Sequence, residues 1–190
     1  PRPGQALGLD PKLISHKDFV PLEKELNQRG ILLKPVQSNL VDVVWRRKPA
    51  FPRGEISVQE TRYAGEGLRR KLERLRHKMD ETGADIHVLS QLDAIAWLFN
   101  IRGSDVEFNP VAIAYAIVTM TKAMLFISRE KVSPEVRRVL AKNLLLEDYE
   151  SLAPSLSALA KKGLRFWLDD SSVSEWIVRL LGGATVVFKP

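Results

Sequence analysis

Residues 92–110 read LDAIAWLFNIRGSDVEFNP, and the interpretation of the whole chain starts from this stretch. Its first half, residues 92–99, is apolar nearly all round at helical spacing. Ser90, followed three residues later by Asp93, predicts where that helix begins. A short helix that is apolar on almost every side is typical of a protein interior, so we expect the core to be built around it.

A dense polar group follows directly after this helix. It consists of Asn100, Arg102, Gly103, Ser104, Asp105, Glu107 and Asn109, and Pro110 ends it before the apolar run 111–118. Taken from the residues alone, the group predicts a turn in which Gly103 adopts a positive φ and the Asn and Asp side chains bond their own backbone. The alternative is a binding loop, because a rigid helix would present many hydrogen-bond donors and acceptors together.

The same stretch, with AYAIV and AMLFI after it, resembles the middle domain of the three-domain Xaa-Pro aminopeptidases, or aminopeptidases P, of the creatinase and prolidase superfamily. The resemblance implies that the chemistry lies in a C-terminal pita-bread domain, where two Asp, one His and two Glu hold two metal ions, usually manganese. That domain would begin just after Pro190. We therefore expect no catalytic residue, metal ligand or cofactor in this chain.

The resemblance also implies a role for the polar group. In the superfamily the non-catalytic domain overhangs the metal cleft, in some members that of the neighbouring subunit. The matching positions are Asn100, Arg102, Gly103, Ser104, Asp105, Val106, Asn109 and Pro110, which we take as candidates for a substrate or interdomain loop. Arg102 could pair with Asp105, with a peptide carboxylate or with a carboxylate of the catalytic domain, and we favour the internal or interdomain pair.

Composition limits the remaining possibilities. The chain has 190 residues, of which 45% are apolar and 27% charged, as in ordinary globular proteins. It lacks cysteine, an apolar run of the roughly 20 residues that cross a membrane, and a signal-peptide pattern, so we predict a cytoplasmic protein without a membrane partner. The formal net charge of +6 allows an acidic or nucleic-acid partner. However, the basic run 69–78 is interleaved with Glu and contains no aromatic residue, so we favour a solvated face over nucleic-acid binding.

The order of patterns predicts an α/β fold. Residues 1–45 resemble the end of a first domain, 46–56 form a Pro- and Gly-containing linker, and 57–190 form the second domain. Six strands are expected at 85–89, 111–118, 123–127, 144–146, 165–168 and 185–188, the second and third as a hairpin. Helices are expected at 15–30, up to about 82, at 133–142, 152–163 and 172–181. Pro21 could move the start of the first helix to about Val20, and Ser172 with Glu175 predicts a capping box. The result is a six-stranded mixed sheet flanked by helices, with a partial α/β appendage.

Other chemical motifs are weak. His16, His77 and His87 do not have metal-ligand spacing, and His87 is expected to face away from the side on which Ile86 and Val88 pack. Asp169 and Asp170 precede a helix, where negative charge is favourable without any catalytic role. Neither a serine-hydrolase elbow nor a phosphate loop is present.

The function these patterns favour is a non-catalytic part of an Xaa-Pro aminopeptidase. The whole enzyme would form a homodimer and release the residue that precedes proline in X-Pro peptides, and this chain would be inactive without its own catalytic domain. The alternative is a pseudoenzyme module that binds an acidic protein or nucleic acid, as the same superfamily fold also occurs in a histone-chaperone subunit.

Overall fold

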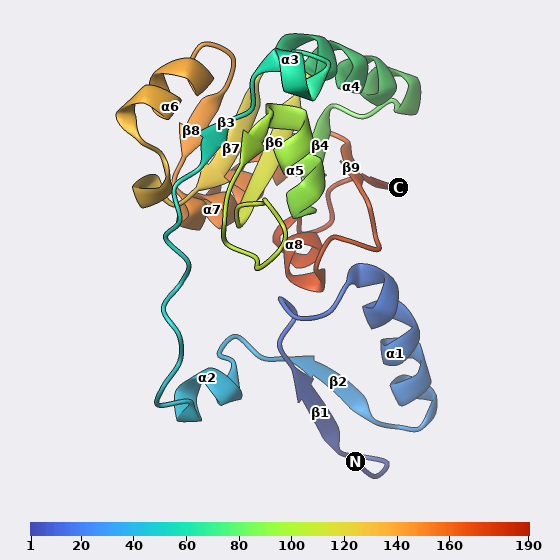
Figure 1. The fold of residues 1–190 in the computed structure, drawn as a ribbon. Helices are drawn as coiled ribbons and strands as arrows, with labels where there is room; N and C mark the ends of the chain where they lie inside the picture. Colours follow the sequence, from blue (N-terminus) through green and yellow to red (C-terminus); the bar gives the residue numbers. More distant parts are fainter.

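The centre of the molecule is a six-stranded mixed sheet, seen in a computed structural model that describes residues 1–190 (Figure 1). The strands lie in the order β10 (Val186–Phe188), β9 (Phe166–Leu168), β4 (Ile86–Leu89), β6 (Ala114–Thr119), β7 (Ala123–Ile127) and β8 (Leu145–Glu147). β6 runs antiparallel to both β4 and β7, and the other neighbouring pairs are parallel. The expected mixed sheet and its hairpin are confirmed.

Helices cover both faces of this sheet. One core joins it to α4 (Leu68–Thr82), α5 (Leu92–Phe99) and α6 (Pro134–Leu140), and a second joins it to α7 (Leu152–Ala160) and α8 (Glu175–Leu180). Short turns of helix complete the domain: α3 (Thr61–Ala64), η1 (Arg129–Lys131) and η2 (Tyr149–Ser151). None of the helices combines the length and apolar character needed to cross a bilayer.

Helix α5 is the buried element that the sequence predicts, with two differences. Its cap is Gln91, and the hydroxyl of Ser90 instead donates to the carbonyl of Ser172 at 3.0 Å. Trp97 is 47% exposed, although Ile95, Ala96, Leu98 and Phe99 around it are buried. The predicted helix start at Ser90 is therefore wrong. The predicted burial on every side is also wrong, because Trp97 is exposed.

The N-terminal unit consists of β1 (Ala6–Leu9), α1 (His16–Gln28) and β2 (Leu32–Pro35), with β1 and β2 parallel. Helix α1 begins at His16, so the expected shift caused by Pro21 does not occur. Ser15 caps the helix, and the backbone N–H groups of the next two residues donate to carbonyls of the sheet domain. These partners stabilise the first turn, so Pro21 is accommodated inside the helix.

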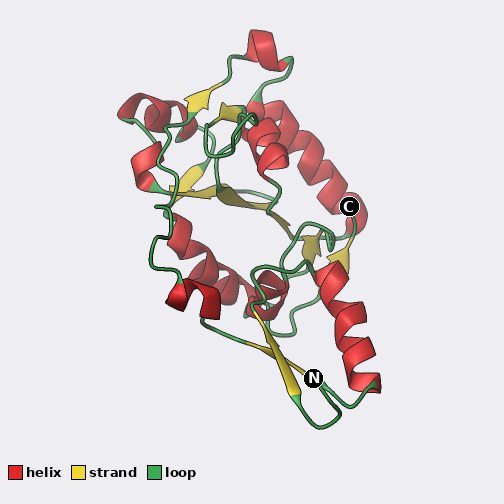
Figure 2. Cartoon of the chain, turned by 60° about the horizontal axis from the view of Figure 1, so that its bottom comes forward, coloured by secondary structure: helices red, strands yellow, loops and turns green.

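The first turn of helix α8 is likewise stabilised by carbonyls of the N-terminal unit. The N–H groups of Glu175 and Trp176 donate to the carbonyls of Ile14 and Pro11, which lie just before α1. The capping box predicted from Ser172 is absent because the carboxylate of Glu175 contacts His16 at 2.8 Å and Arg179 at 2.8 Å. Each helix thus has two of its N-terminal backbone donors satisfied by the other unit, and the N-terminal unit packs against the sheet domain (Figure 2).

An extended segment, residues 36–56, links the N-terminal unit to the sheet domain, and we call it the arm. It carries the short helix α2 (Leu40–Val44), whose apolar side chains are exposed, and continues to β3 (Ser57–Val58). β3 pairs antiparallel with β5 (Ile101–Arg102), which follows α5. The arm therefore ends against the polar stretch that the sequence singles out.

His87 lies on the sheet face opposite to the side on which Ile86 and Val88 pack, as predicted. Its ring lies 4.2 Å from that of Trp167, and its Nδ1 is 3.1 Å from the carbonyl of the same residue. Burial lowers the pKa of His87 to about 4, because the charged ring would lose its water. The ring is therefore neutral at pH 7.

This burial predicts a pH dependence of stability. The unfolded chain binds a proton at His87 at higher pH than the folded chain, so the free energy of unfolding falls between pH 6.5 and pH 4. The part due to His87 is about 3 kcal/mol. Urea unfolding at several pH values should show a shallower slope for His87→Gln than for the wild type. His77→Gln, on the exposed side of α4, should keep the wild-type slope; equal slopes for all three proteins would contradict the assignment.

Candidate functional site

The polar stretch 100–110 forms a loop that is anchored by two buried residues, which we call its feet. Asn100 is the first foot and is only 5% exposed. It ends α5 in the left-handed conformation, with φ of 52°. Its side-chain amide donates to the carbonyl of Glu66 at 2.9 Å, and its side-chain oxygen accepts from the ammonium of Lys71 at 2.6 Å. Asn100 therefore fixes the end of the helix from inside and does not face outward.

Lys71 is a buried partner that the sequence interpretation missed. Its ammonium also donates to the carbonyl of Trp97 at 2.7 Å, and it lies 4.4 Å from the centre of the Trp97 ring. Burial lowers its pKa. The sequence does indicate this burial, because Lys71 lies three residues after Leu68 on the apolar stripe of α4.

Arg102 points back toward the helix. Its Nη1 donates to the carbonyl of Ala96 at 3.2 Å and to that of Ile101 at 2.8 Å. The internal pair between Arg102 and Asp105, one of the favoured alternatives, is therefore absent. The guanidinium thus links the last turn of α5, whose Ala96 carbonyl also accepts from the backbone N–H of Asn100, to β5.

Glycine is required at position 103 because the backbone there lies against residues 111 and 112, and not because of its φ. A Cβ at this position would lie 2.8 Å from the Cβ of Ala112 and 2.9 Å from the carbonyl oxygen of Val111. The expected positive φ at Gly103 is wrong; Asn100 and Phe108 adopt positive φ in this stretch.

Asp105 forms the second foot through a fully buried ion pair. Its Oδ2 accepts from the ammonium of Lys131 at 2.5 Å and from the backbone N–H of Ile113 at 2.6 Å, whereas its Oδ1 has no partner. Both side chains are completely buried. The same ammonium lies 4.7 Å from the ring centre of Phe51 in the arm, so this pair connects the loop, η1 and the arm.

The loop tip, residues 106–109, follows the second foot and faces solvent. A single bridge joins Val106 to Asn109, whose N–H donates to the Val106 carbonyl at 3.1 Å. Phe108 is 98% exposed, and Ser104 and Asn109 are exposed as well. The structure thus turns Asn100 and Asp105 inward and presents Ser104, Phe108 and Asn109 outward. The sequence gives no separate signal for Phe108, since its exposure depends on how the loop is anchored.

The residues of this chain do not fit a metal centre. No three His, Cys, Asp or Glu side chains lie close enough together to hold an ion. The loop itself contains one buried carboxylate that is already paired with Lys131. What it can do is position its exposed tip against another surface.

The chain belongs to the creatinase/prolidase N-terminal domain family, whose model matches residues 47–190. It is 40% identical over 159 residues to the protein of Neosartorya fischeri named "Probable Xaa-Pro aminopeptidase P", covering 83% of this chain and 24% of that protein. The protein of the same name from Arthroderma gypseum is also 40% identical, with 95% of this chain and 30% of the relative covered.

A solved structure shares nearly the whole arrangement. The X-prolyl aminopeptidase of Caenorhabditis elegans, described as a cytosolic enzyme with a di-nuclear active site, superposes with a TM-score of 0.91 at 28% identity. The match covers 99% of this chain and 32% of that one. This chain therefore spans about a quarter to a third of the relatives that it matches.

The buried ion pair makes a strong stability prediction. Lys131→Met removes the charge and leaves Asp105 buried without its partner, which should lower the free energy of unfolding by about 3–5 kcal/mol. Arg129→Met is a matched control from the same turn, where the pair with Asp148 is exposed, and should cost about 1 kcal/mol or less. Urea unfolding measures both; similar losses for the two variants would show that the Lys131 pair has no special role.

Proposed function

We propose that this chain is the non-catalytic N-terminal part of a dinuclear-metal Xaa-Pro aminopeptidase. In this proposal residues 1–45 end the first domain, 46–56 link the domains, and 57–190 form a second domain that covers and shapes an active site on a separate catalytic domain. The main support is the family match over residues 47–190, together with relatives three to four times as long that carry this activity in their names.

The parent enzyme in this proposal removes the N-terminal residue that precedes proline from X-Pro peptides. It works in the cytosol as a homodimer, and its two metal ions, manganese by family resemblance, are held outside this chain. The description of the Caenorhabditis elegans enzyme as cytosolic and di-nuclear supports the location and the number of metals. No step of the reaction is assigned to residues of this chain.

The contribution of this chain is positional. Asn100, Gly103 and Asp105 hold the loop from inside, and the exposed tip with Ser104, Phe108 and Asn109 contacts the catalytic domain or the bound peptide. A loop with two buried feet keeps its tip in one place without paying ordering entropy on contact. Phe108 supports this role, because the loop holds it at a strained positive φ of 60° and 98% exposed, where a partner can cover it.

The exposed tip predicts a specific defect in the full-length enzyme. Phe108→Ala should lower kcat/KM for X-Pro peptides about 10- to 150-fold, because burying one aromatic side chain contributes roughly 1.5–3 kcal/mol. Steady-state kinetics and metal analysis check this, with metal content expected to stay unchanged. Val139→Ala truncates an exposed apolar side chain on α6 and should have no effect. If Phe108→Ala had wild-type kinetics, the tip would have no role in the reaction.

Arg102 gives a second, independent prediction. It is a positioning residue that braces the end of α5, so Arg102→Ala should reduce activity on X-Pro peptides without changing metal content. Arg102→Lys should recover part of the loss, since an ammonium can still donate to one of the two carbonyls. If Arg102→Ala were active but poor in metal, or fully active, this role would be wrong.

A further inference from the structure

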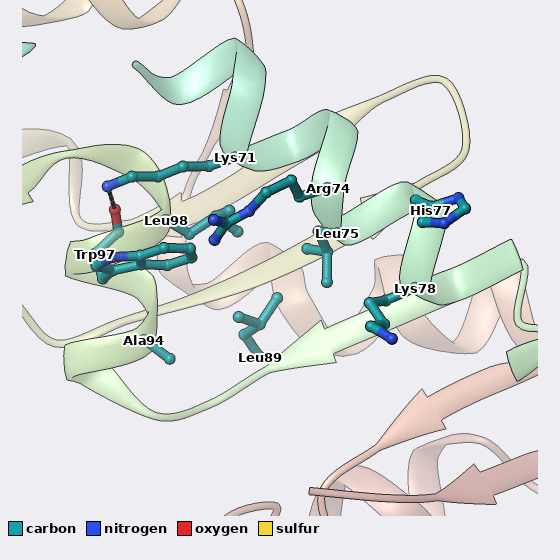
Figure 3. A pocket seen from close by; sticks show the side chains of 9 residues that line it. All are labelled: Lys71, Arg74, Leu75, His77, Lys78, Leu89, Ala94, Trp97 and Leu98. Carbon is teal, nitrogen blue, oxygen red and sulfur yellow. Dashed lines mark hydrogen bonds between the residues drawn. The ribbon is translucent and has the colours of Figure 1, made fainter. Parts of the chain in front are cut away.

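A groove lies between α4 and α5, and none of the exposed tip residues of the loop lines it (Figure 3). Its volume is about 530 Å³, and its floor includes Leu89 of β4. The lining consists of Lys71, Arg74, Leu75, His77, Lys78, Leu89, Ala94, Trp97 and Leu98. The proposed function leaves this groove without a role.

The floor of the groove is apolar and contains one large exposed aromatic side chain. Trp97 leaves 47% of its surface open, while its neighbours Ala96 and Leu98 on α5 are buried. Figure 3 shows the Trp97 ring beside the Arg74 side chain, and the guanidinium lies 5.5 Å from the ring centre. Tryptophan and arginine together on a rigid surface are typical of binding hot spots.

The rim of the groove has one sign of charge. Its lining includes two Lys, one Arg and one His side chain but no carboxylate. The nearest acids lie outside the lining: Glu66 is 3.4 Å from Arg74, and Glu81 is 2.6 Å from Lys78. The Lys78–Glu81 pair is exposed, so it exchanges partners at little cost, whereas the carboxylate of Glu66 is only 18% exposed. The carboxylate of Glu81 also lies 3.2 Å from His77. A complementary partner would bring negative charge to the rim.

The groove is also fixed in width. Lys71 extends from α4 and bonds to the carbonyl of Trp97 on α5, and its second bond to Asn100 holds the same helix end. These bonds cross-link the two walls. A partner therefore meets a preformed surface and loses little free energy in ordering it.

We propose that this groove binds an acidic, amphipathic peptide segment of a protein partner. An aliphatic or aromatic anchor of the segment packs on Trp97, Leu75 and Leu89, and its carboxylates pair with Arg74 and Lys78. This is the helix-in-groove mode of peptide recognition. Nucleic acid is disfavoured because the floor is largely aliphatic and offers a single aromatic ring, whereas single strands bind along successive stacking platforms.

The test is to pan a displayed library of random 12-residue peptides on the 190-residue chain and measure the enriched peptides by titration. The expected enriched peptides are acidic and carry a spaced apolar anchor. Trp97→Ala should weaken their binding about tenfold or more, as loss of a hot-spot side chain does. Arg74→Glu combined with Lys78→Glu should weaken it similarly.

Two control variants separate the groove from general effects. Trp45→Ala removes an equally exposed tryptophan from the arm, and Arg138→Glu reverses an exposed charge on α6; both should bind like the wild type. Circular dichroism shows that each variant is folded. No enrichment, enrichment of basic or purely polar peptides, or equal binding to Trp97→Ala would overturn the proposal. Tighter binding of a single-stranded oligonucleotide, insensitive to Trp97→Ala, would overturn it in favour of nucleic acid.

Discussion

The buried pair between Asp105 and Lys131 is the constraint on which the candidate site depends. Moving two charges out of water is costly, and the cost is offset only while their geometry and additional hydrogen bonds are kept. The backbone N–H of Ile113, just before β6, supplies one such bond, and Lys131 follows β7. The loop is therefore tied to both strands of the central hairpin. Its position follows from the sheet rather than from its own turn sequence.

Each foot of the loop is held by a buried lysine, but the two lysines interact with different kinds of group. Lys131 neutralises a carboxylate, whereas Lys71 donates to the neutral oxygens of Asn100 and Trp97 and has its pKa lowered by burial. In both cases a lysine from a distant segment fixes a polar residue of the loop. Asn100, Arg102 and Asp105, which look functional in the sequence, are thus used internally, and the apolar Phe108 is left outside together with Ser104 and Asn109. This inversion explains why a polar loop can present an apolar contact.

Much of the fold follows from local patterns. The alternation in β4, the stripe of α4 and the Ser133–Pro134 start of α6 all predict elements at nearly their observed bounds. Several predictions about helix ends and loop contacts are wrong because the hydrogen-bond partners lie far away in the chain. Val173 supports the start of α1, and His16 takes the carboxylate that a capping box at Ser172 would have used. The partners of the site, Lys71 and Lys131, are likewise 29 and 26 residues away from Asn100 and Asp105. Periodicity predicts which face is buried, but it does not say which charge meets which across a core.

Helix α5 connects the two surfaces to which we assign roles. Trp97 opens on the groove, Asn100 begins the loop three residues later, and one ammonium bonds to both. A partner that displaced Trp97 would have to break buried hydrogen bonds, each of which costs more to leave unmade than it contributes when formed. The helix therefore responds to a groove ligand as a rigid body. A ligand in the groove leaves the shape of the loop unchanged, because the same lysine holds both walls of the groove and the first foot of the loop.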